Sequence, residues 1–128
     1  MGYVTNIEQE SLENKNFRRV LYTARHSQLV LMSLLPKEEI GEETHGHLDQ
    51  FLRFEAGRGK VVLNGEETEV RDGDAVVIPA GTRHNVINLS DDAPLKLYTI
   101  YSPPEHKDGT IHATKTDALA DKHDHFEE

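Results

Sequence analysis

Hydrophobic residues in the first hundred positions fall into short runs separated by turn-forming residues. The runs are rich in β-branched, aromatic and leucine residues, which is typical of β-strands. They cover residues 17–23, 28–35, 45–56, 60–63, 68–70, 75–78, 84–89 and 95–101. Asn64-Gly65 joins two of them, and Asn-Gly is a strong hairpin signal because both turn residues need positive φ. About eight strands at regular spacing, with almost no helix, predict an all-β sandwich or barrel.

The pattern weakens after Tyr101. Residues 103–128 lack a strong apolar period and contain seven acidic and three basic residues. We therefore expect one β-barrel domain, residues 1–102, followed by an acidic, largely irregular C-terminal tail, residues 103–128. A short helix is expected near residues 116–122. Four of the eight histidines lie in the tail, where we expect them to be solvated.

Composition narrows the classes of function. A chain of 128 residues predicts a single domain, and its net charge of −9 argues against nucleic acid and anionic membranes as partners. Residues 29–35 form the longest apolar run, which is too short to span a bilayer. The N-terminus has no basic and apolar secretory pattern, so we expect a cytoplasmic protein. Because the sequence contains no cysteine, any metal must be held by nitrogen and oxygen ligands.

One histidine-bearing segment, residues 73–88, reads as a strand, a tight turn and a second strand. Pro79 presets its own φ, and Gly81 can take the positive φ that a tight turn demands. His84 opens the second strand, where its ring can reach into the mouth of a barrel. We interpret Asn88 as a strand-end residue that satisfies backbone groups.

A histidine pair lies earlier in the chain. His45 and His47 are two residues apart, so they share one face of an extended strand, which suits two imidazoles on one ion. Gln50 and Leu52 have the opposite parity. Both pairs can face the interior only if a bulge or turn lies near residues 48–49.

These two segments resemble the paired motifs of the cupin superfamily. The second family motif is G-x5-P-x-G-x2-H-x3-N, and every fixed position is matched here, by Gly73, Pro79, Gly81, His84 and Asn88. The first, G-x5-H-x-H-x3,4-E-x6-G, is matched in part. His45, His47 and Gly57 fit it, while Gln50 stands in place of the glutamate and follows His47 one residue early.

The resemblance implies a small single-domain cupin of the RmlC-like jelly-roll type, built as a double-stranded β-helix. It also implies a divalent transition metal in the barrel mouth, commonly Fe, Mn, Ni, Zn or Cu. The preferred ligand set is His45, His47, Gln50 and His84. If the strand has no bulge, Asp49 shares the histidine face and supplies a carboxylate. In a third arrangement His47 stays in solvent, and His45, His84 and either Asp49 or Gln50 bind the metal.

Three classes of function follow from the resemblance. The first is a metal-dependent cupin acting on a small polar molecule, with sugar or sugar-acid isomerisation by Lewis-acid chemistry as the first reaction to test. The second is a dioxygenase-type cupin oxidoreductase, and the third is a non-catalytic cupin that binds a small ligand. Isomerisation also needs a general base, expected from a Glu or Tyr at the mouth.

Several neighbouring residues have less specific interpretations. Tyr98, Tyr101 and Arg53 are candidates to line the mouth, although strand parity does not decide among them. Glu42 and Glu43 are interpreted as solvated loop residues. We also expect a homodimer, formed through sheet faces or through exchange of the N-terminal or C-terminal segment.

Overall fold

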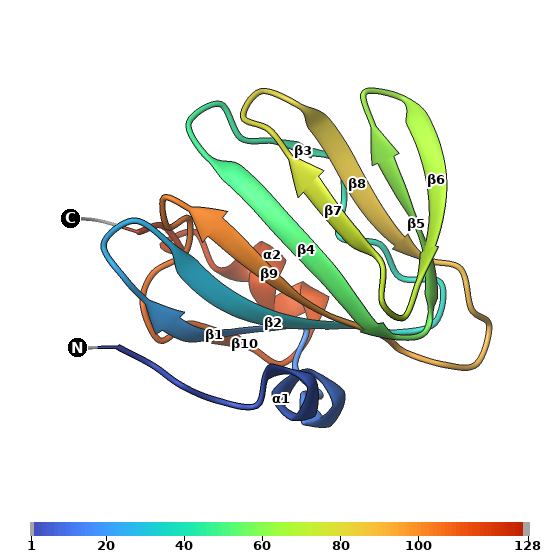
Figure 1. Ribbon diagram of the computed structural model, residues 1–128, viewed down its shortest axis with the longest axis horizontal. Helices are drawn as coiled ribbons and strands as arrows, with labels where there is room; N and C mark the ends of the chain where they lie inside the picture. Colours follow the sequence, from blue (N-terminus) through green and yellow to red (C-terminus); the bar gives the residue numbers. More distant parts are fainter. Residues whose placement is uncertain (1, 127–128) are drawn as a thin grey trace.

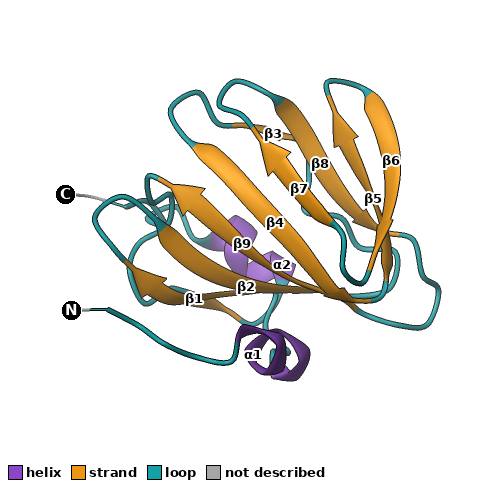
Figure 2. Ribbon diagram, in the orientation of Figure 1, coloured by secondary structure: helices purple, strands orange, loops and turns teal. Residues whose placement is uncertain are grey.

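The computed structural model describes residues 2–126, which form two antiparallel β-sheets and two short helices (Figure 1; Figure 2). The six-stranded sheet has the order β10-β1-β2-β9-β4-β7, and the four-stranded sheet has the order β3-β8-β5-β6. The strands are β1 (Arg18–Thr23), β2 (Gln28–Leu34), β3 (Glu43–Thr44), β4 (Asp49–Ala56), β5 (Arg58–Leu63), β6 (Glu66–Arg71), β7 (Ala75–Ile78), β8 (Arg83–Asn88), β9 (Leu95–Ser102) and β10 (Ile111–His112). The helices are α1 (Ile7–Glu13) and α2 (Lys115–Ala120). The predicted all-β jelly-roll barrel is confirmed.

The run expected as one extended stretch over residues 45–56 is divided. β3 ends at Thr44, the chain bends at Gly46 and His47, and β4 begins only at Asp49. The bend changes the strand parity, because the two residues in it do not alternate between sheet faces. As a result His45 and Gln50 are both largely buried, with a side-chain exposure of 13% for His45 and a residue exposure of 5% for Gln50.

The space between the sheets is filled by alternate residues of the strands. In β9, Leu95, Leu97, Thr99 and Tyr101 are buried while the residues between them are half-buried. They join one continuous apolar core that receives Val61 and other residues from the four-stranded sheet. This core supports the strand ends on which the candidate site residues lie.

Asn88 stabilises one end of the barrel through side-chain hydrogen bonds to the backbone. Its side chain is fully buried, and its amide nitrogen donates to the carbonyls of Leu34, Leu35 and Ala93 at 3.1, 3.0 and 2.9 Å. Its oxygen accepts from the N–H of Ser90 at 2.9 Å. These bonds satisfy backbone groups where the ends of β2 and β8 meet the loop before β9. The interpretation of Asn88 as a residue that satisfies backbone groups is therefore confirmed.

The N-terminal segment forms a helix that the sequence pattern did not predict. Asn6 caps α1 by accepting a hydrogen bond from the N–H of Gln9 at 3.0 Å. The helix packs beside β2, β4 and β9, and it buries Ser11 (Figure 1). A seven-residue helix whose buried position is a serine carries too little apolar periodicity to be recognised. In this structure the segment contacts its own chain.

The C-terminal segment is mostly irregular, as expected, and α2 lies close to the predicted helix. The expectation that its histidines are solvated is wrong for His106 and His112, which are 7% and 4% exposed. β10 pairs with β1, which places His112 opposite Arg18. The contacts of these buried side chains are polar, so the pattern of hydrophobic residues along the sequence does not predict their burial.

A buried ionic network attaches this segment to the barrel. Asp124 accepts a hydrogen bond from Nδ1 of His106 at 2.7 Å, and its carboxylate lies 3.9 Å from the guanidinium of Arg18. His112 lies 3.4 Å from the same guanidinium and 2.9 Å from Asp121. Burial opposes ionisation of Asp124, but the hydrogen bond and charge of His106 outweigh it and lower the pKa of Asp124 to about 2.

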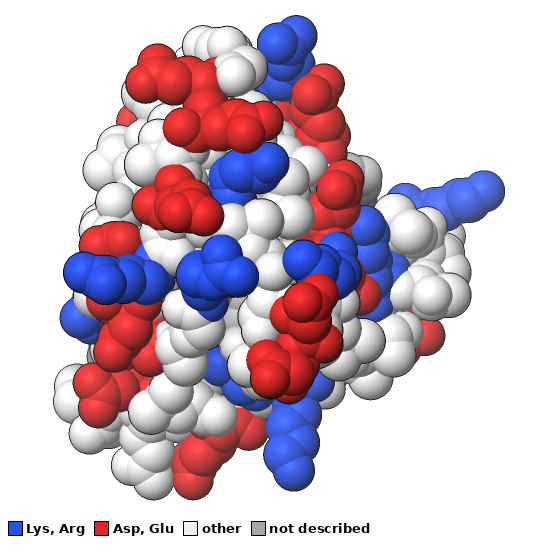
Figure 3. Space-filling model, turned by 90° about the vertical axis from the view of Figure 1, so that its right-hand side faces the viewer, with Lys and Arg blue, Asp and Glu red and all other residues white. Residues whose placement is uncertain are grey.

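No helix within residues 2–126 is long and apolar enough to cross a membrane. On the face toward β5 and β6, acidic and basic side chains are interspersed (Figure 3). Arg58 lies 3.6 Å from Glu69, and Lys60 lies 3.2 Å from Glu67. This face therefore presents no basic patch of the kind that binds a nucleic-acid backbone.

Replacing Gly57 with alanine is expected to destabilise the barrel more than replacing Gly73. Both residues have positive φ, +95° and +92°, so both substitutions incur backbone strain of about 1–2 kcal/mol. A Cβ on Gly57 would also lie 2.5 Å from the carbonyl oxygen of Pro94, whereas a Cβ on Gly73 meets nothing within 4 Å. Urea unfolding of the two variants measures the difference, and equal losses would contradict the predicted clash.

Asp124→Asn is expected to remove part of the decrease in folding stability that the wild type shows as the pH falls. The folded pKa of Asp124 lies below its ordinary value, so its contribution is present above about pH 4 and is lost as the pH falls toward 2. The stability advantage of the wild type over D124N should therefore shrink across that range. Urea midpoints measured at pH 7, 4 and 2.5 check this, and a constant difference between the two proteins would contradict it.

Candidate metal centre

Two hydrogen bonds join the histidine-bearing segments. The N–H of Gly81 donates to the carbonyl of His45 at 2.8 Å, and the N–H of Ala80 donates to Oδ1 of Asp49, also at 2.8 Å. The turn takes this shape because Gly81 has a φ of +86°. It leads directly into β8, which brings the ring of His84 to 5.5 Å from the ring of His45.

The orientation of His84 suits a metal ligand. Its Nδ1 lies 2.9 Å from the carbonyl oxygen of Thr82, and a carbonyl only accepts, so Nδ1 carries the hydrogen. In the neutral ring Nε2 then holds the lone pair. Ligating histidines are commonly fixed in this way by a backbone carbonyl on the other nitrogen.

Gln50 presents a buried acceptor beside it. Its amide nitrogen donates to the hydroxyl of Thr99 at 3.0 Å, while Oε1 has no hydrogen-bond partner among the described residues. Buried polar atoms are normally paired, so an unpaired oxygen in the interior requires an explanation. Gln50 contributes to a small pocket that is also lined by His45 and His84, together with Leu48, Ile78, Pro79 and Thr82.

His45 lies between two carboxylates. Its Nε2 is 3.1 Å from Oε2 of Glu43, and its Nδ1 is 3.0 Å from Oε2 of Glu105. These hydrogen bonds, first that to Glu105 and then that to Glu43, raise the pKa of His45 to about 9. For both glutamates burial opposes ionisation, but the hydrogen bond and charge of His45 outweigh it and hold their pKa values below the usual range.

Neither carboxylate was expected at this site. Glu43 was interpreted as a solvated loop residue, but its side chain is 36% exposed and is bonded to His45. The spacing of Glu43 and His45 was a usable signal, because residues two apart in an extended segment share a face. Glu105 belongs to the C-terminal segment, which was expected to be solvated, and no local pattern connects it to His45.

His47 and Asp49 are not among the residues that line the pocket. Both residues are exposed, and Asp49 is engaged by the N–H of Ala80. Neither residue lines the pocket, to which His45, Gln50 and His84 contribute. This placement corresponds to the arrangement in which His47 stays in solvent, and it separates His47 from the other members of the preferred set.

Of the three candidates to line the mouth, only Tyr101 is there. Its ring lies 6.1 Å from that of His45, and burial raises the pKa of its hydroxyl well above the usual range. Tyr98 lies beside Phe51, and Arg53 donates to Glu55 at 2.7 Å. Tyr98 and Arg53 are register partners in β9 and β4 that alternate with the buried residues, so they lie on the outer face of the sheet.

Within residues 2–126, no three histidine, aspartate or glutamate side chains are already gathered in position to hold a metal ion. The available donors nevertheless fit a transition metal. His84 and Gln50 line one pocket and have Nε2 and Oε1 without a protein partner among the described residues, and His45 becomes a third donor once one of its nitrogens is deprotonated. Imidazole nitrogens suit Fe, Ni, Cu or Zn better than Mg or Ca.

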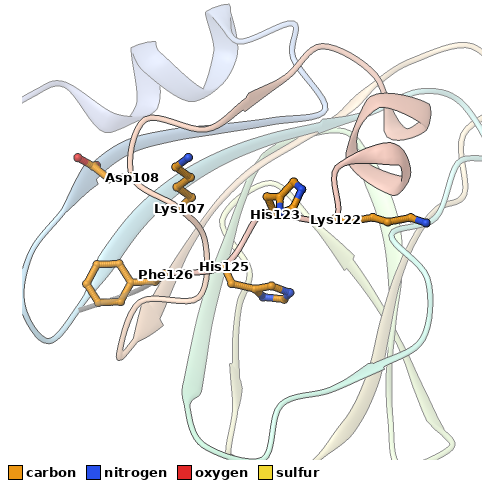
Figure 4. Close-up of a pocket in the computed structure, with 6 residues that line it drawn as sticks. All are labelled: Lys107, Asp108, Lys122, His123, His125 and Phe126. Atoms are coloured by element: carbon orange, nitrogen blue, oxygen red, sulfur yellow. The ribbon is translucent and has the colours of Figure 1, made fainter.

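Two further histidines, His123 and His125, line a surface hollow near the C-terminus, together with Lys107, Asp108, Lys122 and Phe126 (Figure 4). His123 and His125 are exposed, and the side chains labelled in Figure 4 point in different directions. Asp124, between the two histidines, is engaged with His106. These three consecutive residues therefore do not converge on a common point.

Comparison with known proteins identifies a family. The family model described as "Cupin domain" matches residues 30–101. The uncharacterised protein YrkC of Bacillus subtilis is 48% identical over 124 residues, covering 92% of this chain and 66% of YrkC. The chain thus spans about two thirds of the length of YrkC.

Two solved structures are similar to this chain. The crystal structure of BH2720 from Bacillus halodurans is similar with a TM-score of 0.91 and 50% identity, covering 94% of this chain and 96% of that chain. The structure of KdgF from Halomonas sp. is similar with a TM-score of 0.64 and 24% identity, covering 71% of this chain and 79% of that chain. The second likeness concerns the fold alone.

Glu105→Gln is expected to lower the pKa of His45 in metal-free protein. The hydrogen bond to Glu105 is the largest cause of the raised value of about 9, and the substitution removes the charge while keeping the size of the side chain. An NMR titration of the imidazole resonances measures the pKa. Glu42→Gln is the control, since Glu42 lies 3.8 Å from Arg83 at the surface. The same pKa of His45 in both variants would contradict the assignment.

Proposed function

The chain belongs to the cupin family, and on this basis we propose that it binds a divalent transition metal in the barrel mouth and acts there on a small polar molecule. The observation that carries the proposal is that Gln50, which lines the same pocket as His84, has a buried Oε1 with no hydrogen-bond partner among the described residues. A metal ion bound there gives this oxygen the partner that the protein itself does not supply.

The proposed protein ligands are His45, Gln50 and His84. All three donors are neutral when His45 has lost a proton, so these three by themselves do not reduce the charge of the dication. A bound metal of this kind supplies Lewis-acid chemistry by polarising a carbonyl or hydroxyl group. His47 is exposed and is left out of the set.

Isomerisation of a sugar or sugar acid is the first reaction we propose. Such a reaction moves a proton between neighbouring carbons, so it requires a general base beside the polarised oxygen. Tyr101 is unsuited to that role because burial raises the pKa of its hydroxyl and keeps it protonated. Glu105 is ionised, has a side chain that is 16% exposed, and contacts His45, so we assign the base to Glu105.

Metal content tests the proposal most directly. Wild-type protein purified without a histidine tag should carry stoichiometric transition metal, measured by elemental analysis, and His84→Ala should lose most of it. His26→Ala is the matched control, because His26 is exposed in the connection between β1 and β2. Full metal content in His84→Ala would show that the proposed site is wrong.

Activity separates the three classes of cupin. Interconversion of an aldose and a ketose by the metal-loaded protein supports isomerisation. Oxygen consumption by the Fe(II)-loaded protein indicates the dioxygenase-type alternative instead. Thermal stabilisation by a ligand without turnover in any metal form indicates a binding module.

A further inference from the structure

The position of Glu43 on its strand directs it toward the metal centre. β3 pairs with β8 in antiparallel register, and Glu43 is the partner of His84. Residues directly opposite in such a pair point to the same face, with their Cβ atoms about 4.5–5.5 Å apart. The carboxylate of Glu43 is therefore on the side of the sheet from which His84 reaches the pocket.

The contact between Glu43 and His45 has the dimensions of two neighbouring ligands. Oε2 of Glu43 lies 3.1 Å from Nε2 of His45. Two donors each about 2.1 Å from one ion, at angles between those of octahedral and tetrahedral geometry, lie about 3.0–3.4 Å apart. One ion can thus bind both atoms with little change in their separation.

The opposite edge of the His45 ring is held by the C-terminal segment. Nδ1 of His45 bonds to Glu105 at 3.0 Å. Gln28 fixes the backbone there, because its side chain accepts from the N–H of His106 at 2.9 Å and donates to the carbonyl of His106 at 2.8 Å. A carboxylate on Nδ1 leaves Nε2, the nitrogen beside Glu43, as the ligating atom.

The donors already assigned lack a negative charge. Gln50 occupies the position of the family glutamate, and an amide cannot supply one. Asp49 is exposed and engaged with Ala80. Glu43 lies opposite His84 in the register of β3 and β8, and its Oε2 is 3.1 Å from Nε2 of His45, so it is the carboxylate best placed to meet the metal.

We propose that Glu43 is the anionic metal ligand of this chain and supplies the charge that Gln50 lacks at the family position. This inference rests on the proposed function, since it concerns the same metal. On binding, the proton on Nε2 of His45 passes to solvent, and both Nε2 and a Glu43 oxygen coordinate the ion in place of that proton. No further reactant is needed.

Titration of metal-free protein with Co²⁺ tests the assignment. Glu43→Gln should weaken Co²⁺ binding by at least about 100-fold, because even the loss of an outer-shell partner commonly costs 10–100-fold. The visible spectrum of any complex that still forms should change, because one oxygen ligand has been replaced or lost. Glu43→Asp should bind with an affinity between those of the wild type and E43Q.

Glu42→Gln is the matched control, because it removes the neighbouring carboxylate, which faces Arg83 at the surface. It should bind Co²⁺ within about twofold of wild type with an unchanged spectrum. Urea unfolding of each metal-free variant checks that the fold is kept. Since Glu43 is partly exposed on a two-residue strand, all variants should remain folded.

The possible outcomes separate the two proposals. If wild-type protein binds Co²⁺, His84→Ala does not, and E43Q behaves as E42Q does, the role of Glu43 is overturned while the proposed metal centre stands. If wild-type protein binds no Co²⁺, the metal centre fails, and the role of Glu43 fails with it. Selective loss in E43Q with a changed spectrum supports the inference.

Discussion

The hydrogen bond from the N–H of Gly81 to the carbonyl of His45 is the contact on which the site depends. It ties the turn before β8 to the bend before β4, and these segments carry His84 and Gln50. The second bond, from Ala80 to Asp49, fixes the same two segments from the other side of the bend. These two hydrogen bonds hold the segments whose side chains His45, Gln50 and His84 line one small pocket.

The charged groups around the pocket are connected to the C-terminal segment. His45 is flanked by Glu43 and Glu105, and Glu105 belongs to the segment that His106 and Asp124 attach to the barrel. The ring of Tyr101 lies 6.1 Å from that of His45 and 5.0 Å from that of His106, so it bridges the two groups. The C-terminal segment is therefore part of the mouth, and it brings a charged side chain to the candidate site.

Local sequence predicted the strands and the second motif well. The turn at Gly81 and the position of His84 followed from φ preferences and strand parity, which act over a few residues. The ligand set was harder, because a bend at Gly46 and His47 reverses parity and moves His47 into solvent. Local sequence reasoning could not predict the position of Glu105, because its contact with His45 depends on how the C-terminal segment packs against the barrel.

The sequence by itself determined the all-β barrel, the turn that presents His84, the role of Asn88 in satisfying backbone groups and the replacement of the family glutamate by Gln50. These features depend on periodicity and on backbone preferences of single residues. Only the tertiary structure decided that Glu43 and Glu105 flank His45 and that His106 is buried. Such contacts join residues from distant strands through hydrogen bonds and charge, and neither leaves a repeating pattern along the chain.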